Sequence, residues 1–472
     1  MRLRAIILLL ASLFVTACAN ADVIHLKNGR TIWADEVRDK GTRVEYDVGD
    51  DSYAIPKSSV DHIETGGVPP QFGGSSSGAS HDVPTFVPPD TAKVDPGLLN
   101  KIVHDGGVDP DALASIAQQG NAKTTAVGYF IAGKYELQHG NFPKARNYFE
   151  SAVEADPENP SILNYYAAML VRTGNPGEAL PYAERAVRIA PDSPDTLAVL
   201  GYAQYASDRV SDAIRTLKRS LSLRPDPSIQ GLLAKAEKDA SAESNFSENE
   251  SSHFTLRYEG GETSPAFRQQ IVATLDSAYD DLVRQFGVAP RNTIAVILYT
   301  NQQFFDVTNA PSWTGALNDG KLRIPINGLN SVTPELARVL KHELAHSFIN
   351  QLSAGRCPQW LHEGIAQAME PKRLRYGPQL AQLYASQHEI PFNALEGSFM
   401  QFTGPQAVLA YEESLAAADY IIDTYGESDL QRILARLGEG SSTEAALRST
   451  IHSDYGQLED EVGKYLADKY GK

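Results

Sequence analysis

Cysteine is almost absent from this sequence of 472 residues. The only two are Cys18, in an N-terminal segment that we expect to be a targeting signal, and Cys357. We therefore expect no intrachain disulfide. No local cysteine-protease signature surrounds Cys357, so we interpret it as a small packed residue beside Pro358 rather than a nucleophile.

Basic residues are scarce as well. The chain has 42 lysines and arginines against 59 aspartates and glutamates, which gives a formal net charge of −17. An acidic surface repels phosphate backbones and anionic lipid headgroups. The composition therefore excludes nucleic acid as an expected partner, and it argues against electrostatic attachment to a membrane.

The apolar run at the N-terminus is too short to span a bilayer. It covers residues 5–15, follows the basic Arg2 and Arg4, and has the length of a signal-peptide core. Two processing sites fit the residues after it. Residues 15–18 resemble a bacterial lipobox that would lipidate Cys18, whereas residues 19–21 form an A-x-A site that would release a soluble protein. Both predict export, to the periplasm or to an outer-membrane-anchored lipoprotein.

Turn and linker signals divide the first quarter of the mature chain. Residues 22–65 show short alternating segments and an Asn28-Gly29 turn, which predict a small β module. Residues 66–97 are rich in glycine, serine and proline and predict a linker. A short helical lead-in is expected over residues 98–123.

Residues 124–240 contain an internal repeat of 34 residues. Small residues, closing prolines, turn residues and bulky residues each recur in this register: Ala145, Ala179 and Ala213; Pro157, Pro191 and Pro225; Gly140, Gly174 and Asp208; Tyr129, Leu163 and Leu197. The pattern resembles the tetratricopeptide repeat. The resemblance implies three helix-turn-helix units stacked in a solenoid that binds peptides or partner proteins, with a rigid spacer as the alternative.

The remainder predicts one α+β domain over residues 253–472, after a polar linker at 241–252. Strands are expected at 253–258, 293–299 and 321–326, and Pro325 places the last of these at a sheet edge. An amphipathic helix is expected at 266–286. Thr333 and Pro334 are typical of the start of a helix, which should run to about residue 352.

That helix carries a metal-ligand pattern. Residues 342–346 read His-Glu-Leu-Ala-His. Residues four apart share one helix face, so His342 and His346 can ligate one ion, and Glu343 can reach a water on it as a general base. The other residues of this helix are strongly apolar, and buried ionisable groups without a use are costly.

A third ligand is expected on the next helix, which begins near Pro358. Glu363 would complete a set of two histidines and one carboxylate and leave a position for water. His362 is the rival, but adjacent residues point about 100° apart around a helix, so the two side chains cannot both ligate.

These residues carry a family resemblance. His342, Glu343 and His346, followed by Trp-Leu-x-Glu-Gly at 360–364, resemble the gluzincin metallopeptidases, and residues 253–470 resemble the bacterial peptidase MA-like domain, often joined to tetratricopeptide repeats. The resemblance implies a zincin-like fold and one zinc ion held by His342, His346 and Glu363, with Glu343 as general base.

The same resemblance implies a downstream side chain that stabilises the oxyanion. Tyr411 is the candidate, with His388 and Tyr420 as alternatives. Gly315-Ala316 resembles the start of the substrate-binding strand of zinc aminopeptidases, but the glutamate that binds a substrate α-amine is missing there. This departure favours an endopeptidase. Gln367 is expected at the surface, with a contact to the ligand shell as the alternative.

The sequence thus predicts a multidomain protein with a small β module, an all-α repeat solenoid and an α+β zincin-like domain. We interpret it as an exported zinc metallopeptidase that acts on protein or peptide substrates, with protein partners on the repeats. An exported repeat scaffold with an inert zincin-like domain is the alternative. Zinc-assisted hydrolysis of a non-peptide amide is a third hypothesis.

Overall fold

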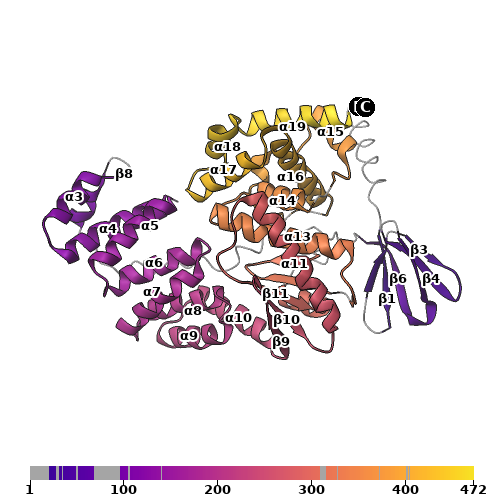
Figure 1. The fold of residues 1–472 in the computed structure, drawn as a ribbon, viewed down its shortest axis with the longest axis horizontal. Coiled ribbons are helices and arrows are strands. Elements are labelled where there is room, and N and C mark those ends of the chain that lie inside the picture. The colour runs from indigo at the N-terminus through magenta and orange to yellow at the C-terminus, as the bar shows by residue number, and fades with distance from the viewer. Residues whose placement is uncertain are drawn as a thin grey trace, which may run out of the picture.

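The computed structural model describes residues 21–27, 31–34, 36–48, 51–67, 96–104, 107–139, 141–308, 315–326, 328–370, 373–399, 402 and 404–471. Residues 1–20 of the predicted signal peptide, including Cys18, lie outside them, as do the Asn28-Gly29 turn and most of the predicted 66–97 linker. N-terminal strands, a helical solenoid and a C-terminal domain with a mixed sheet confirm the predicted fold class (Figure 1). Within the described ranges, no helix combines the length and apolarity needed to cross a membrane.

The N-terminal module consists of two three-stranded antiparallel sheets. Their strands are β1 (Ala21–Leu26), β2 (Thr31–Ala34) and β6 (Val60–Gly67) in one sheet, and β3 (Glu36–Asp39), β4 (Arg43–Val48) and β5 (Asp51–Pro56) in the other. Ile24 and Val44, from the central strand of each sheet, are fully buried and belong to the small core of the module.

The lead-in consists of α2 (Pro96–Ile102), the short strands β7 (Val103–His104) and β8 (Gly107–Val108), and α3 (Pro110–Gln118). The solenoid follows as antiparallel helix pairs: α4 (Ala122–Gln138) with α5 (Phe142–Ala155), α6 (Pro160–Arg172) with α7 (Pro176–Ile189), and α8 (Pro194–Ala206) with α9 (Val210–Leu223). The register alanines on α5, α7 and α9, which are Ala145, Ala179 and Ala213, are completely buried. Helix α10 (Pro227–Ala242) closes the solenoid.

The C-terminal domain is built on a five-stranded sheet in the order β12-β13-β11-β10-β9. Three parallel strands form its centre, and an antiparallel strand lies on each edge: β10 (Phe254–Glu259), β11 (Ile294–Tyr299) and β13 (Leu322–Pro325) between β9 (Phe246–Glu250) and β12 (Leu317–Asn318).

Two expectations about this sheet are wrong. Residues 241–252 are not a linker, because they complete α10 and form β9. The side chains of β9 are largely exposed, so an edge strand there needs backbone pairing but no apolar face. The strand with Pro325 is not an edge strand, because β12 pairs outside it. Its pairs with β12 stop at Arg323, so the missing N–H of Pro325 breaks no hydrogen bond to β12.

The two faces of the sheet are covered by different parts of the chain. Helices α11 (Pro265–Phe286) and α13 (Pro334–Ser353) pack on one face, against side chains such as Leu256, Val296 and Ile324. Alternate residues point the other way. There Ile297 and Tyr299 pack with Phe304 of α12 (Asn301–Thr308), beside the last solenoid helix, α10.

A helical layer completes the domain: α14 (Gln359–Met369), α15 (Gly377–Ala385), α16 (Gly404–Tyr425), α17 (Glu427–Gly438), α18 (Thr443–Ile451) and α19 (Tyr455–Tyr470). Helices α14 and α16 cross closely at Gly364, where any Cβ would overlap the backbone carbonyl oxygen of Ser414. Glycine at this position therefore lets α16 approach the helix that carries Glu363.

Candidate metal centre

Local signals fix the helix that carries the His-Glu-x-x-His motif. Thr333 accepts a hydrogen bond from the backbone N–H of Leu336 at 3.1 Å and so caps α13, and Pro334 occupies its first position. Apolar residues on several sides bury the helix in the main core. The motif therefore lies inside the domain, with His342 and His346 fully buried.

Three side chains from two helices converge on one point. The Nε2 atoms of His342 and His346 are 3.2 Å apart. Glu363 Oε2, from α14, is 3.5 Å from the first nitrogen and 3.9 Å from the second. Two nitrogens bound to one zinc ion at a tetrahedral angle lie about 3.3–3.4 Å apart. The spacing and the donor types of the three side chains therefore fit a single zinc ion.

Glu363 is held in this orientation by its own helix. Gln359 Nε2 donates to Glu363 Oε1 at 3.0 Å, which leaves Oε2 facing the imidazoles. The rival ligand His362 instead stacks on His346, with ring centroids 4.5 Å apart. Among the described residues, the set able to hold a metal consists of His342, His346 and Glu363, whose ligand atoms lie within 4.8 Å of one another.

Glu343 lies beside these ligands with an available oxygen. Its Oε2 is buried and has no hydrogen-bond partner among the described residues. Burial raises the pKa of Glu343 to about 8; His342 opposes this shift, and the nearby carboxylates Glu363 and Glu370 reinforce it. A buried acceptor without a protein partner fits a water or substrate group in its place.

Glu370, at the end of α14, is a part of the site that the sequence reasoning missed. Its carboxylate is buried, and Oε1 is 3.4 Å from Nδ1 of His342, the nitrogen that faces away from the ligand cluster. Burial alone would lower the pKa of His342, but the neighbouring carboxylates of Glu363 and Glu370 raise it to about 10. Glu370 is thus placed to orient the imidazole from behind. Glu370 lies about two helical turns after Glu363, and this spacing in the sequence predicts that both side chains lie on the same helix face.

The charges of the site also fit a cation. Glu343, Glu363 and Glu370 are all buried. Burial lowers the pKa of His346 well below its usual value, and the neighbouring His362 and His342 lower it further, so this ring is neutral. Three buried carboxyl groups therefore lie beside a neutral imidazole, and a bound divalent cation would favour their ionised forms.

The candidate oxyanion residue Tyr411 lies on α16, within electrostatic range of the site. Burial raises the pKa of its hydroxyl well above the usual value, and the carboxylates of Glu363 and Glu343 raise it further. Of the alternatives, Tyr420 donates its hydroxyl to Glu461 at 3.1 Å, and His388 is exposed.

Gln367 is buried rather than at the surface, contrary to expectation. Its Nε2 donates to the backbone carbonyl of Tyr411 at 3.1 Å and, more weakly, to that of Glu363 at 3.4 Å. Gln367 therefore links α14 to α16 beside the candidate metal centre, because it binds the backbones of Glu363 and Tyr411.

Edge strand β12 is fixed to the motif helix. Asn318 Nδ2 donates to the backbone carbonyl of Glu343 at 2.7 Å and to Ser347 Oγ at 2.9 Å. Strand β12, the last strand of the sheet among the described residues, therefore runs beside the candidate metal centre.

Cys357 is a free thiol near the site. Burial raises the pKa of Cys357 well above its usual value, and Glu363 raises it further, so the thiol stays protonated. A protonated thiol is a poor nucleophile, which agrees with its interpretation as a packed residue.

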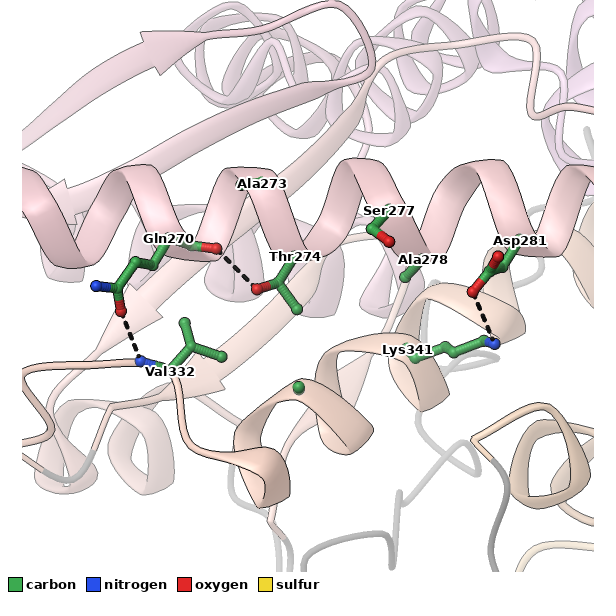
Figure 2. Close-up of a pocket in the computed structure, with 9 residues that line it drawn as sticks. Gln270, Ala273, Thr274, Ser277, Ala278, Asp281, Val332 and Lys341 are labelled. Carbon is green, nitrogen blue, oxygen red and sulfur yellow. Dashed lines mark hydrogen bonds and ion pairs between the residues drawn. The ribbon is translucent and has the colours of Figure 1, made fainter.

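A groove of about 610 Å³ lies between α11 and α13, and Figure 2 shows the residues that line it. Gln270 and Asp281 of α11 line it, and Lys341 of α13 reaches Asp281 at 3.5 Å. The metal-ligand candidates do not line this groove. Adjacent residues on a helix point in different directions, so Lys341 faces the groove while His342 faces the candidate metal centre.

Comparisons with known proteins agree with this arrangement. Residues 274–468 match the family model of the Peptidase MA superfamily, and residues 132–194 and 170–236 match two tetratricopeptide-repeat models. A comparison with curated proteins gave no match.

Among solved structures, two related repeat domains resemble part of the chain. The first repeat domain of Spaghetti (RPAP3) bound to an HSP90 peptide is 20% identical, and an NMR structure of the first repeat domain of human RPAP3 is 21% identical. Each match covers 25% of this chain and 95% of that chain, with a TM-score of 0.25. From the family models, this chain carries a Peptidase MA superfamily domain in its C-terminal part, preceded by tetratricopeptide repeats.

Proposed function

We propose that the C-terminal domain is a zinc-dependent endopeptidase that hydrolyses peptide bonds of protein clients. One observation carries the proposal: ligand atoms of His342, His346 and Glu363 converge within 4.8 Å, and the carboxylate of Glu343 lies beside them with an unpartnered oxygen among the described residues. This is the donor set of catalytic zinc sites that leave one position open.

The residues divide the chemistry as follows. When bound, zinc polarises the scissile carbonyl and acidifies the attacking water. Glu343 takes a proton from that water and later delivers it to the leaving amine nitrogen. The hydroxyl of Tyr411, kept protonated by its raised pKa, donates a hydrogen bond to the oxyanion as charge develops there.

Edge strand β12 is a second argument for a peptide substrate. An extended chain can add to an open sheet edge through backbone hydrogen bonds. The tie from Asn318 to Glu343 holds that edge next to the proposed base. The segment Gly315-Ala316 offers no glutamate for a substrate α-amine, which favours cleavage within chains over removal of terminal residues.

We further propose that the protein is exported and that its repeats bind partner proteins or the clients themselves. The basic and apolar N-terminal segment supports export, and the tetratricopeptide-repeat matches support a protein-binding role.

Peptides blocked at both ends test the proposed activity. The zinc-loaded full-length protein should cleave internal bonds of acetylated and amidated peptides, and Glu343→Gln should abolish cleavage while zinc stays bound. Cleavage that requires a free α-amine would contradict the endopeptidase assignment. Equal activity in wild type and Glu343→Gln would remove Glu343 from the mechanism.

A further inference from the structure

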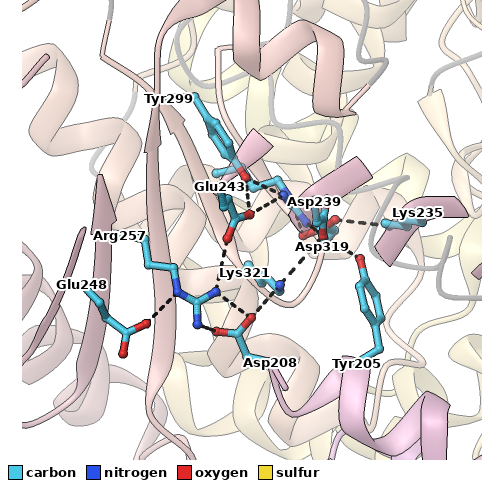
Figure 3. A network of polar contacts seen from close by, with 11 residues as sticks. Tyr205, Asp208, Lys235, Asp239, Glu243, Glu248, Arg257, Tyr299, Asp319 and Lys321 are labelled. Carbon is cyan, nitrogen blue, oxygen red and sulfur yellow. Dashed lines mark hydrogen bonds and ion pairs between the residues drawn. The ribbon is translucent and has the colours of Figure 1, made fainter. Parts of the chain in front are cut away.

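The last solenoid helix covers the sheet face opposite α11 and α13. Arg257, Tyr299 and Arg323 point toward it from three neighbouring strands, and a network of charged groups joins them to the repeat region (Figure 3). Arg323 is only 1% exposed. In the sequence its strand alternates polar and apolar residues as a half-exposed strand would. The repeat region, through Asp239 of α10, covers the part of this face around Arg323.

Helix α10 contacts the β12–β13 hairpin through two side chains that lie one helical turn apart. Lys235 Nζ lies 3.3 Å from Asp319 Oδ2, and Asp239 Oδ2 lies 2.8 Å from an Nη of Arg323. Within the hairpin, Arg323 Nε donates to Asp319 Oδ1 at 3.0 Å. Lys235 and Asp239 of α10 thus pair with Asp319 and Arg323 of the hairpin. These opposite charges pair in only one alignment of the helix with the hairpin.

Asp208 adds a second attachment at an unusual position. It occupies the repeat register of Gly174, and both residues have left-handed backbones, with φ of 62° and 75°. Glycine suits that conformation better than aspartate. The carboxylate of Asp208, however, pairs with Lys321 at 2.6 Å and with Arg257. The third repeat therefore departs from the repeat pattern at Asp208, the residue whose side chain contacts the C-terminal domain.

The contacts between α10 and the hairpin are connected to the candidate metal centre through neighbouring residues of the hairpin. Asp319 directly follows Asn318, whose side chain binds the backbone of Glu343. The contacts of α10 with the hairpin therefore restrain β12, the strand that lies along α13. A buried salt bridge is weak evidence for net stability, and its best-attested role is to fix one arrangement of the elements that it joins.

We propose that Asp208, Lys235 and Asp239 are positioning residues for edge strand β12. The repeat array is then a fixed support of the substrate-binding edge rather than a module tethered beside it. The consequence for catalysis rests on the proposed peptidase function; the positioning of β12 does not.

Two full-length variants separate positioning from folding. Asp208→Gly restores the glycine of the preceding repeat, and Lys235→Met keeps the stem of the side chain but loses the charge. Arg291→Met is the matched control, because Arg291 joins the domains through Glu178 at 3.0 Å and Asn175 at 3.1 Å but is 57% exposed and belongs to a different contact. Circular dichroism of each variant checks that its helices are retained before exchange is compared.

Amide hydrogen exchange of residues 315–325 is the primary readout. Both test variants should exchange about tenfold faster there than wild type, as expected for loss of one charged contact, and the control should match wild type. Unchanged exchange in both test variants would overturn the proposal. With an active enzyme, the same variants should raise KM for long peptides more than they lower kcat. Absence of all peptidase activity would refute the proposed function, and the exchange result would still decide the positioning.

Discussion

Replacing Glu370 perturbs the candidate metal centre without touching a proposed ligand. Its carboxylate lies 3.4 Å from Nδ1 of His342, on the side of the ring opposite the nitrogen that faces Glu363. A buried acceptor at Nδ1 fixes the tautomer and direction of a ligating imidazole. Loss of such a partner should therefore weaken metal binding and leave the ligand set intact.

The chemistry of the replacement sets the size of the effect. Outer partners of metal ligands typically contribute 10–100-fold to metal affinity or activity. Glu370→Gln keeps an acceptor oxygen but loses the charge, so we expect a loss in zinc affinity of about tenfold, at the lower end. Glu370→Ala removes the acceptor and leaves Nδ1 of His342 buried without it, so a loss of about 100-fold is expected.

Competition with a chromogenic chelator measures zinc affinity for wild type and both variants. Glu413→Gln is the control, because Glu413 is also fully buried but lies with Glu389 and Glu459, outside the ligand cluster. The expected order of affinity is wild type and Glu413→Gln first, then Glu370→Gln, then Glu370→Ala. Wild-type affinity in both Glu370 variants would refute the argument that this carboxylate orients His342.

Three other residues of the C-terminal domain give further predictions. Gly364→Ala should lower the free energy of unfolding in denaturant by about 1–3 kcal/mol, because its Cβ overlaps the carbonyl of Ser414; unchanged stability would show that α14 and α16 can separate freely. Tyr411→Phe should lower kcat about 100-fold with zinc content unchanged, whereas full activity would shift the oxyanion role elsewhere. Burial raises the folded-state pKa of Glu413 to about 8, so wild type should lose stability on the order of 2–4 kcal/mol as pH rises from about 4.5 to 8. Glu413→Gln does not titrate and should therefore become more stable relative to wild type across the same window. Parallel stability–pH curves would contradict that last prediction.

The sequence predicted those parts of the protein whose signals are local. Thr333 and Pro334 mark the start of α13, and the spacing of His342 and His346 places both rings on one face. The 34-residue register anticipated the helix pairs, because each register alanine is completely buried and every repeat must reproduce that packing. The third ligand candidate, Glu363, followed from a second apolar helix in the expected order along the chain.

Contacts between distant segments were harder to predict. The strand with Pro325 has the signal of an edge strand, yet a two-residue strand pairs outside it, and two residues carry no periodicity. Residues 241–252 have the composition of a linker, because an exposed edge strand needs no buried side chains. The burial of Arg323 depends on α10, whose packing on the sheet has no local signature in the sequence.

Zinc content measured together with casein cleavage, on wild type and Glu343→Gln side by side, tests the central claim most directly. The proposed site predicts about one equivalent of zinc in both proteins and cleavage by wild type alone, since the variant keeps all three ligands and loses only the base. Absence of zinc from both proteins would contradict the metal centre and leave the repeat scaffold as the better account of the chain.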